Sequence, residues 1–480
     1  MRDYPWIAVW LAALLGLLGI QFANDVLPYS VAVVLAINAV LRLRERSWGI
    51  AGADVACGAV AATWPGSTVV ALALAAAAWI VWTGLSLAVT SLAPEWDPPR
   101  AVRYVPSVVA VVLAGLLVTL TVYAKAAAPR PTTFYATPDQ LPSATGVLLR
   151  AEQYTGSTPT GTQGWRILYS TVGIDGKVAA ASALVLSPRQ AGPQPVVAWA
   201  HPTTGINRGC APSLTDDVQD YGEVPMTALR SGLAVVAPDY VGLGTQGPSP
   251  YFVGDAEARS LLDAVQAAHQ LKGPNLSAKT VAWGHSQGGQ AALWAGTLAP
   301  RYPDLKLLGV AGLAPAADLP RMFGEIRDDS AGVSLGAFTV SAYSNAYSDI
   351  RFEDYFRPIL TRTMQGVADR CNLDPGLFVA QLGMDRLAGN IWKQSPDSGP
   401  LRARLQQNIP PASEVPVIIE QGLDDVIVPA HIQADYVDGK CIRYKTYRGL
   451  DHNTLVTDEA PVADLIAWTD ALLAGQSMDC

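Results

Sequence analysis

The sequence predicts an α/β fold, a mostly parallel sheet with helices on both faces, preceded by an all-α transmembrane region. Two observations predict it. Residues 1–128 are apolar stretches separated by short polar breaks, whereas the later residues alternate apolar, β-rich runs with helical patterns. Continuous apolar strands separated by helices are typical of a parallel sheet that is buried on both faces.

The composition supports this division. Hydrophobic residues make up 50% of the 480 residues and charged residues only 15%, whereas about 25% charged residues is usual in a soluble protein. Part of the chain is therefore expected to lie in lipid. The net charge is −8 and no long basic run occurs, so nucleic acid is not expected as a partner.

The first region contains apolar runs close to the ~20 residues that a helix needs to cross a membrane. Four of these runs are 6–22, 26–41, 67–92 and 104–127. A fifth run, 49–64, is shorter and carries Asp54, so it either crosses the membrane or lies at its interface.

Two basic loops decide between four and five spans. The arginines of 42–46 and those of 100–103 both lie on the cytoplasmic side, as the positive-inside tendency requires, only if 49–64 crosses. We favour five spans, which predict a multi-pass protein of the cell membrane with the residues after Ala128 outside the cytoplasm. Four spans would leave those residues inside, and a cleaved signal peptide is the alternative for the first span.

The cysteines after residue 128 form an even set, which fits two disulfides in an oxidising compartment. They are Cys210, Cys371, Cys441 and Cys480. The sequence cannot choose among the pairings, and free buried thiols are the alternative. We expect Cys210 to pair with Cys371 and Cys441 with Cys480.

The globular domain is expected over residues 146–480, after a Pro- and Thr-rich linker at 129–145. A β-hairpin is predicted around Gly173–Gly176. The further predicted strands are Gln194–Ala200, Leu233–Ala237, Thr280–Trp283, Leu307–Leu313, Val415–Glu420 and Cys441–Tyr447. The predicted helices are Asp255–Leu271, Gln287–Leu298 and Pro461–Leu473.

Residues 314–413 interrupt this alternation of strands and helices. They hold many aromatic side chains in a helical or irregular context. We interpret the segment as a cap inserted over the functional site; ordinary core helices are the alternative.

The sequence Gly284-His-Ser-Gln-Gly288 lies between an apolar strand and an Ala/Leu-rich helix. A sharp strand-to-helix turn exposes a serine hydroxyl, and the glycines let the chain turn tightly around it. Ser286 is therefore the predicted nucleophile; a packing turn of small residues is the alternative.

A nucleophilic serine needs a base and an acid that orients the base. His452 follows the last predicted strand and precedes the final helix, so it is the predicted base. Two adjacent aspartates follow the preceding strand. We prefer Asp425 because it keeps a Gly-x-x-Asp-x-x-Val-Pro spacing, and we expect Asp424 to be a turn residue that satisfies local backbone amides.

The oxyanion hole is expected to use two backbone N–H groups. One belongs to Gln287, which follows the nucleophile. The other belongs to the loop after the strand Gln194–Ala200, where Pro202 has no N–H, so Thr203 or Thr204 donates and we favour Thr203. A zinc site at His201 and His285 lacks a third ligand, and no metal or other cofactor is expected.

Several motifs carry a resemblance to the secretory lipase family of α/β-hydrolases over about residues 140–475. They are Val236-Ala-Pro-Asp-Tyr-Val-Gly-Leu-Gly244, Tyr251-Phe-Val-Gly254, Leu261-Leu-Asp263 and the Ser286 turn. The resemblance implies an α/β-hydrolase fold, a lid, a catalytic triad of Ser286, Asp425 and His452, and triacylglycerol or other ester substrates.

Together these patterns predict a membrane-anchored serine hydrolase, a lipase or carboxylesterase that cleaves lipid or other acyl esters through an acyl-enzyme. Two alternatives stay open. An acyltransferase would use the same triad with an alcohol in place of water. A non-enzymatic membrane protein would carry an inactive hydrolase domain, although the intact order of the three residues argues against it.

Overall fold

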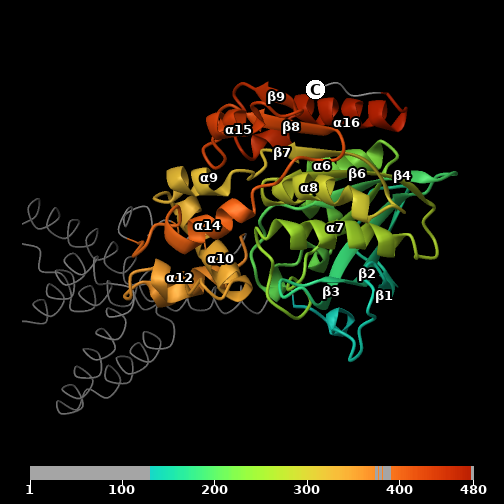
Figure 1. Ribbon diagram of the computed structural model, residues 1–480. Coiled ribbons are helices and arrows are strands. Elements are labelled where there is room, and N and C mark those ends of the chain that lie inside the picture. Colours follow the sequence, from blue (N-terminus) through green and yellow to red (C-terminus); the bar gives the residue numbers. More distant parts are fainter. Residues whose placement is uncertain (1–129, 373–376, 378–380, 382–390, 477–480) are drawn as a thin grey trace, which may run out of the picture. The chain divides into compact units, whose positions relative to one another are not determined.

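The computed structural model describes residues 130–372, 377, 381 and 391–476 (Figure 1). The predicted transmembrane region 1–128 and its five spans lie outside these residues. Within the described part of the chain, no helix combines the length and the hydropathy needed to cross a membrane. The described residues up to Arg357 and from Met364 onward form one compact unit.

The described strands form one sheet in the order β1-β2-β3-β5-β4-β6-β7-β8-β9. From β5 to β9 neighbouring strands are parallel, whereas β1, β2 and β3 form antiparallel pairs at one end. The predicted mostly parallel sheet is therefore confirmed. The strands are β1 Leu148–Gln153, β2 Thr162–Val172, β3 Val178–Pro188, β4 Gln194–Ala200, β5 Ala234–Pro238, β6 Leu276–His285, β7 Lys306–Leu313, β8 Val417–Gly422 and β9 Arg443–Tyr447.

Helices cover both faces of this sheet because successive side chains of a strand point to opposite faces. In β4, Val196 and Ala198 pack with α7 and α8, whereas Val197 and Trp199 pack with α6 and α16. Figure 1 shows these two helical layers beside the sheet. The helices are α6 Glu223–Arg230, α7 Gly254–Ala268, α8 Gln287–Leu298, α15 Ala430–Val437 and α16 Glu459–Leu473.

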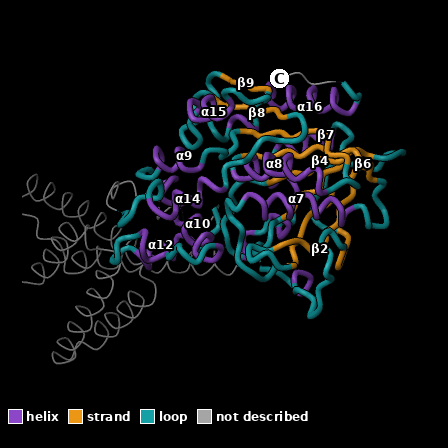
Figure 2. The backbone as a smooth tube through the Cα atoms, viewed as in Figure 1, coloured by secondary structure: helices purple, strands orange, loops and turns teal. Residues whose placement is uncertain are grey.

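The segment between β7 and β8 is helical, with no strand among its described residues. Of its helices, α9, α10 and α14 lie together at one side of the sheet (Figure 2). This arrangement is compatible with the predicted insertion at 314–413, whose role as a cap stays a prediction. The helices are α9 Leu319–Ile326, α10 Ser330–Ala346, α11 Phe352–Tyr355, α12 Thr361–Ala368 and α14 Gly399–Gln407.

Asp239, which directly follows β5, holds the Asp239-Tyr240 turn through buried hydrogen bonds. Its side chain is fully buried and accepts hydrogen bonds from the hydroxyl groups of Ser182 and Ser213 and from the Ser213 N–H. Burial raises the pKa of Asp239 to about 6. The next residue, Tyr240, has a positive φ of 66°, so the hydrogen bonds to Asp239 hold a turn that is strained for a residue with a side chain.

Candidate active site

Ser286 lies at the turn from β6 into α8, as the sequence predicts, with a positive φ of 56°. Its N–H donates to Leu313 O at 2.9 Å. Close packing makes glycine necessary on both sides of it. A Cβ on Gly284 would lie 2.0 Å from Gly288 O, and a Cβ on Gly288 would lie 1.9 Å from Ala200 O. The turn is thus pressed against the end of β4, where the predicted oxyanion loop begins.

His452 and Asp425 are brought together, as predicted for a base and its orienting acid. His452 Nδ1 lies 2.7 Å from Asp425 Oδ2, and the two side chains are only 8% and 0% exposed. The loop that carries His452 is fixed by Asp451, whose carboxylate accepts the N–H groups of Asn453 and Thr454. A buried carboxylate at Nδ1 leaves Nε2 as the nitrogen available for a proton from a nucleophile.

The two neighbouring aspartates behave differently from each other. Asp425 Oδ1 accepts the N–H groups of Ile427 and Val428, both at 2.8 Å, so its second oxygen is directed to His452. The side chain of Asp424 is exposed. The local backbone amides that we expected Asp424 to satisfy are therefore satisfied by Asp425, because the turn places that carboxylate over its own following residues.

Ser286 and His452 are linked through His285. His285 Nε2 lies 2.9 Å from His452 O, and the two imidazole rings are 4.7 Å apart between centroids. Burial, followed by the charge that His452 would carry, holds the pKa of His285 well below its usual range, so His285 is neutral. No hydrogen bond joins the Ser286 hydroxyl to the His452 ring among the described residues.

The two predicted oxyanion residues are buried next to the turn. Thr203 is 9% exposed and Gln287 is 1% exposed. Within the described part of the chain, neither N–H group has a hydrogen-bond acceptor. Buried N–H groups usually have a partner, and unpaired ones suit a site that stabilises a developing negative charge. Thr203 Oγ1 lies 2.9 Å from Tyr251 Oη.

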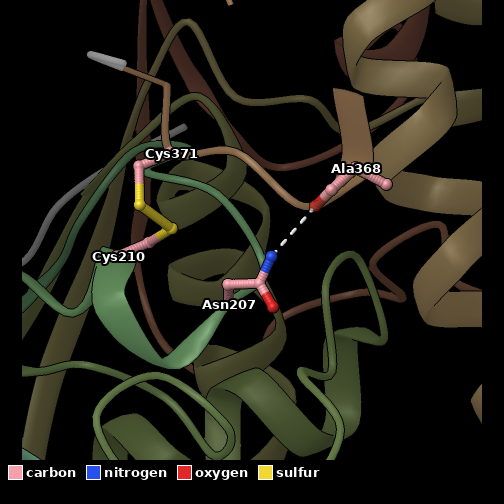
Figure 3. Close-up of a disulfide and its surroundings, with 4 residues drawn as sticks. All are labelled: Asn207, Cys210, Ala368 and Cys371. Carbon is pink, nitrogen blue, oxygen red and sulfur yellow. Dashed lines mark hydrogen bonds between the residues drawn. A yellow bond between two sulfur atoms is a disulfide. The ribbon is translucent and has the colours of Figure 1, made fainter. Parts of the chain in front are cut away.

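A disulfide fixes the loop that carries Thr203. Cys210 and Cys371 are bonded, with a Cα–Cα distance of 5.2 Å, as we expected (Figure 3). Asn372 N–H donates to Thr204 O at 2.8 Å, and Asn207 Nδ2 donates to Ala368 O at 3.4 Å. Cys441 is also disulfide-bonded, and its expected partner, Cys480, lies outside the described residues.

Glu257 is the main residue of this region that the sequence interpretation missed. It is fully buried on α7 and accepts a hydrogen bond of 2.5 Å from Gln287 Nε2. A signal for it exists in the sequence, because Glu257 precedes Leu261 by four residues and so lies on the apolar face of the helix.

The histidines at 201 and 285, considered above as zinc ligands, have other partners. His201 Nδ1 lies 2.6 Å from Pro202 O, and burial lowers the pKa of His201 to about 4. Among residues 130–372 and 391–476, no group of three His, Cys, Asp or Glu side chains is placed to hold a metal ion.

Known proteins with similar sequences are lipases. The sequence profile described as "Secretory lipase" matches residues 215–479. Lipase 6 of Candida albicans is 26% identical over 349 residues, 65% of this chain and 73% of that protein. The secreted triacylglycerol lipase LIP2 of Malassezia furfur is 26% identical over 242 residues, 46% of this chain and 50% of that protein.

Solved structures share the fold. A ligand-bound rice cell wall degrading esterase, LipA of Xanthomonas oryzae, is 21% identical with a TM-score of 0.60, over 70% of this chain and all (100%) of that one. Candida antarctica lipase A in its closed state is 20% identical with a TM-score of 0.59, over 73% and 88%. At these identities the likeness establishes the α/β-hydrolase fold alone.

The predicted location as a multi-pass protein of the cell membrane is corrected by these comparisons. Relatives of this chain are named secreted lipases, and the described residues contain no helix that could cross a membrane. The prediction depended on the hydropathy of 1–128, and hydropathy measures only how apolar a segment is.

A matching family profile over 215–479, lipase relatives and the shared fold lead to one conclusion: this chain belongs to the secretory lipase family and is an ester-hydrolysing enzyme.

Proposed function

We propose that this enzyme cleaves lipid or other acyl esters through an acyl-enzyme formed on Ser286. The observation that carries the proposal is the buried hydrogen bond of 2.7 Å between His452 Nδ1 and Asp425 Oδ2. The turn that carries Ser286 has a strained backbone, and its neighbour His285 contacts the His452 carbonyl oxygen. A serine, an imidazole and a buried carboxylate in this chain order are the groups that acyl transfer requires.

In the proposed reaction Ser286 Oγ attacks the ester carbonyl carbon while its proton moves to His452 Nε2. The carbonyl oxygen becomes an oxyanion, which the N–H groups of Gln287 and Thr203 stabilise. The C–O bond to the alcohol then breaks, and His452 returns the proton to the leaving oxygen. Water repeats the sequence on the acyl-enzyme, releases the acid and restores the Ser286 hydroxyl. Asp425 orients the His452 ring and stabilises the imidazolium.

The apolar surroundings support an acyl substrate. Tyr251, which contacts Thr203, packs against Phe252 and against Phe338 of α10, with centroid distances of 4.3 and 6.0 Å. Tyr343 of α10 donates from its hydroxyl to Phe252 O at 3.0 Å. Because α10 belongs to the inserted segment, we propose that its helices α9, α10 and α14 form a cap whose aromatic side chains border the site.

Replacement of Ser286 by alanine tests the proposal. Ser286→Ala is expected to abolish release of p-nitrophenol from p-nitrophenyl butyrate and to prevent labelling by a fluorophosphonate. The matched control is Ser260→Ala. Ser260 is fully buried on α7, and its hydroxyl is among the buried groups without a partner in the described part of the chain, so its loss is expected to leave turnover unchanged. Retained turnover in Ser286→Ala would refute the assignment.

The ester preference is measured with the same pair of proteins. Release of fatty acid from an emulsified triacylglycerol, compared with turnover of the soluble butyrate ester, separates a lipase from a carboxylesterase. Both activities are expected to disappear together in Ser286→Ala and to persist together in Ser260→Ala.

A further inference from the structure

A buried carboxyl group contacts the residue that follows the nucleophile. Glu257 Oε1 accepts the Gln287 Nε2–H at 2.5 Å and the Phe252 N–H at 3.3 Å. The side chain of Glu257 is 0% exposed, and among the described residues no cation forms an ion pair with it. A buried carboxylate without a cation is costly in free energy, so the group is expected to keep its proton.

The surroundings of Glu257 favour its neutral form. Burial raises the pKa of Glu257 to about 8, although the hydrogen bonds from Gln287 and Phe252 oppose the shift. The titratable groups that sense its charge are three tyrosines, and burial holds the pKa of each above its usual range. They are therefore neutral, and none supplies a positive charge. The three are Tyr240, Tyr251 and Tyr343.

The Glu257 and Gln287 side chains each have a second oxygen atom, besides the Glu257 Oε1 and Gln287 Nε2 that bond each other. Glu257 Oε2 and Gln287 Oε1 are both buried, and neither has a hydrogen-bond partner among the described residues. If Glu257 were ionised, both atoms would be acceptors and neither could satisfy the other. A proton on Oε2 turns it into a donor, and a carboxylic acid and an amide then form a cyclic pair with two hydrogen bonds. In such a pair the proton would give each of these two atoms a hydrogen-bond partner.

The segment that contains Glu257 also contacts the other predicted oxyanion residue. Tyr251 Oη lies 2.9 Å from Thr203 Oγ1, and the neighbouring Phe252 donates its N–H to Glu257. Phe252 has a positive φ of 57°, a strained conformation that neighbouring contacts must hold. Residues 251–257 thus join the side chains of Thr203 and Gln287 through one short stretch of chain.

We propose that Glu257 is a positioning residue for the oxyanion hole, which acts as a neutral carboxylic acid that holds the Gln287 side chain and so fixes the Gln287 N–H. The inference rests on the proposed function, in which that N–H stabilises the oxyanion. Loss of the Glu257 proton removes one hydrogen bond of the pair and loosens the first turn of α8. The effect falls on kcat, because the oxyanion exists only in the reacting complex.

The test compares kcat and KM for p-nitrophenyl butyrate across alkaline pH in the wild type, Glu257→Gln and Glu257→Met. The wild-type kcat is expected to fall as pH rises past about 8, and KM to change little. Glutamine mimics the neutral acid at every pH, so Glu257→Gln is expected to keep kcat within roughly threefold at pH 7 and to lose the alkaline fall. Methionine removes both hydrogen bonds, and a kcat loss of at least roughly tenfold is expected, since a whole oxyanion donor is worth roughly 10²–10³.

Glu420→Gln is the matched control. Glu420 is a second buried glutamate and is 1% exposed. Burial raises the pKa of Glu420 to about 8, and its Oε1 accepts a hydrogen bond from the Tyr447 hydroxyl. This variant is expected to retain the wild-type alkaline fall in kcat. An alkaline fall that survives in Glu257→Gln would overturn the inference, as would a wild-type kcat that is flat up to about pH 9.5.

The experiments distinguish a failure of this inference from a failure to fold and from a failure of the proposed function. Should Glu257→Met not fold, Glu257→Gln decides the matter alone, since it preserves both the shape and the hydrogen bonds. Turnover in Ser286→Ala refutes the proposed function, whereas an active wild type with an unaltered Glu257→Gln profile refutes only the role of Glu257.

Discussion

Gln421 donates a hydrogen bond of 3.1 Å from Nε2 to Asp425 Oδ2, the same oxygen that faces His452. The second oxygen of Asp425 is held by two backbone N–H groups. Both oxygens of Asp425 therefore take part in hydrogen bonds, which hold the carboxyl group in one orientation toward His452.

Asp425→Asn is expected to lower kcat by roughly 10³–10⁴, because an amide next to Nδ1 favours the wrong tautomer of His452 and cannot balance its charge. Steady-state turnover of p-nitrophenyl butyrate measures the loss. Asp424→Asn is the matched control, since that side chain is exposed, and its kcat should stay near the wild-type value. If the two variants lost activity equally, the assignment of Asp425 would be wrong.

Gly288→Ala is expected to destroy activity and to reduce the free energy of unfolding by roughly 1–3 kcal/mol through overpacking. A methyl group there would lie 1.9 Å from Ala200 O, so the nucleophile turn and the end of β4 would have to separate. Chemical denaturation and turnover are measured on the same samples.

Gly366→Ala is the control for that variant. Gly366 lies in α12, and apart from its own helix backbone and chain neighbours no atom of the described residues lies within 4 Å of an added Cβ, so alanine there should stabilise the helix by about 0.8–1 kcal/mol. Full activity in Gly288→Ala would show that the turn does not need this close contact.

Removal of the Cys210–Cys371 disulfide is expected to lower both stability and kcat. The bond closes a separation of 161 residues, and its loss should cost roughly 2–4 kcal/mol. The kcat loss follows from position, because the bond and the Asn372–Thr204 hydrogen bond hold the loop that carries Thr203. The double variant Cys210→Ala/Cys371→Ala is compared with the wild type by thermal unfolding and by turnover.

Cys441→Ala gives the contrast for the double variant. Cys441 is disulfide-bonded and precedes β9, away in sequence from the oxyanion loop. The Cys441→Ala variant should lose stability, while its kcat should stay within about threefold of the wild-type value. A double variant with wild-type kcat would show that the loop keeps its geometry without the bond.

The sequence predicted the strongly patterned elements and missed two short helices and one edge strand. The bounds of β4 and α8 match the prediction, because one is a continuous apolar run and the other an Ala/Leu-rich helix that starts at the serine turn. The eight-residue helices α6 and α15 and the exposed β1 were missed. Such elements take their stability from packing against the sheet, which periodicity over a few residues does not reveal.

The residues of the candidate site could be proposed from the sequence where chemistry dictates the residue type, and not where packing dictates it. Ser286, His452 and Asp425 stand after strands at positions that chain order alone suggests. Glu257 and Gln287 are separated by 30 positions, and no local spacing indicates that their side chains meet. Only the tertiary contact between α7 and α8 brings them together.

The stability of the folded protein is expected to fall as pH rises from about 4.5 through 8, and Glu420→Gln should reduce this fall. Burial raises the pKa of Glu420 to about 8 in the folded state, whereas an exposed glutamate has a pKa of about 4.3. Between these values the folded protein binds more protons than the unfolded chain, so its free energy of unfolding decreases with pH.

Urea denaturation at about pH 5 and about pH 9 measures the difference for each protein. Glu414→Gln, a change at an exposed glutamate, is the control and should follow the wild type at both pH values. At about pH 9 the free energy of unfolding is expected to be higher for Glu420→Gln than for the wild type, because glutamine carries no charge in the buried position next to Tyr447. If the free energy of unfolding fell equally between the two pH values in Glu420→Gln and in the wild type, Glu420 would be ionised in the folded protein. Lys445 and Arg443 would then compensate the buried charge.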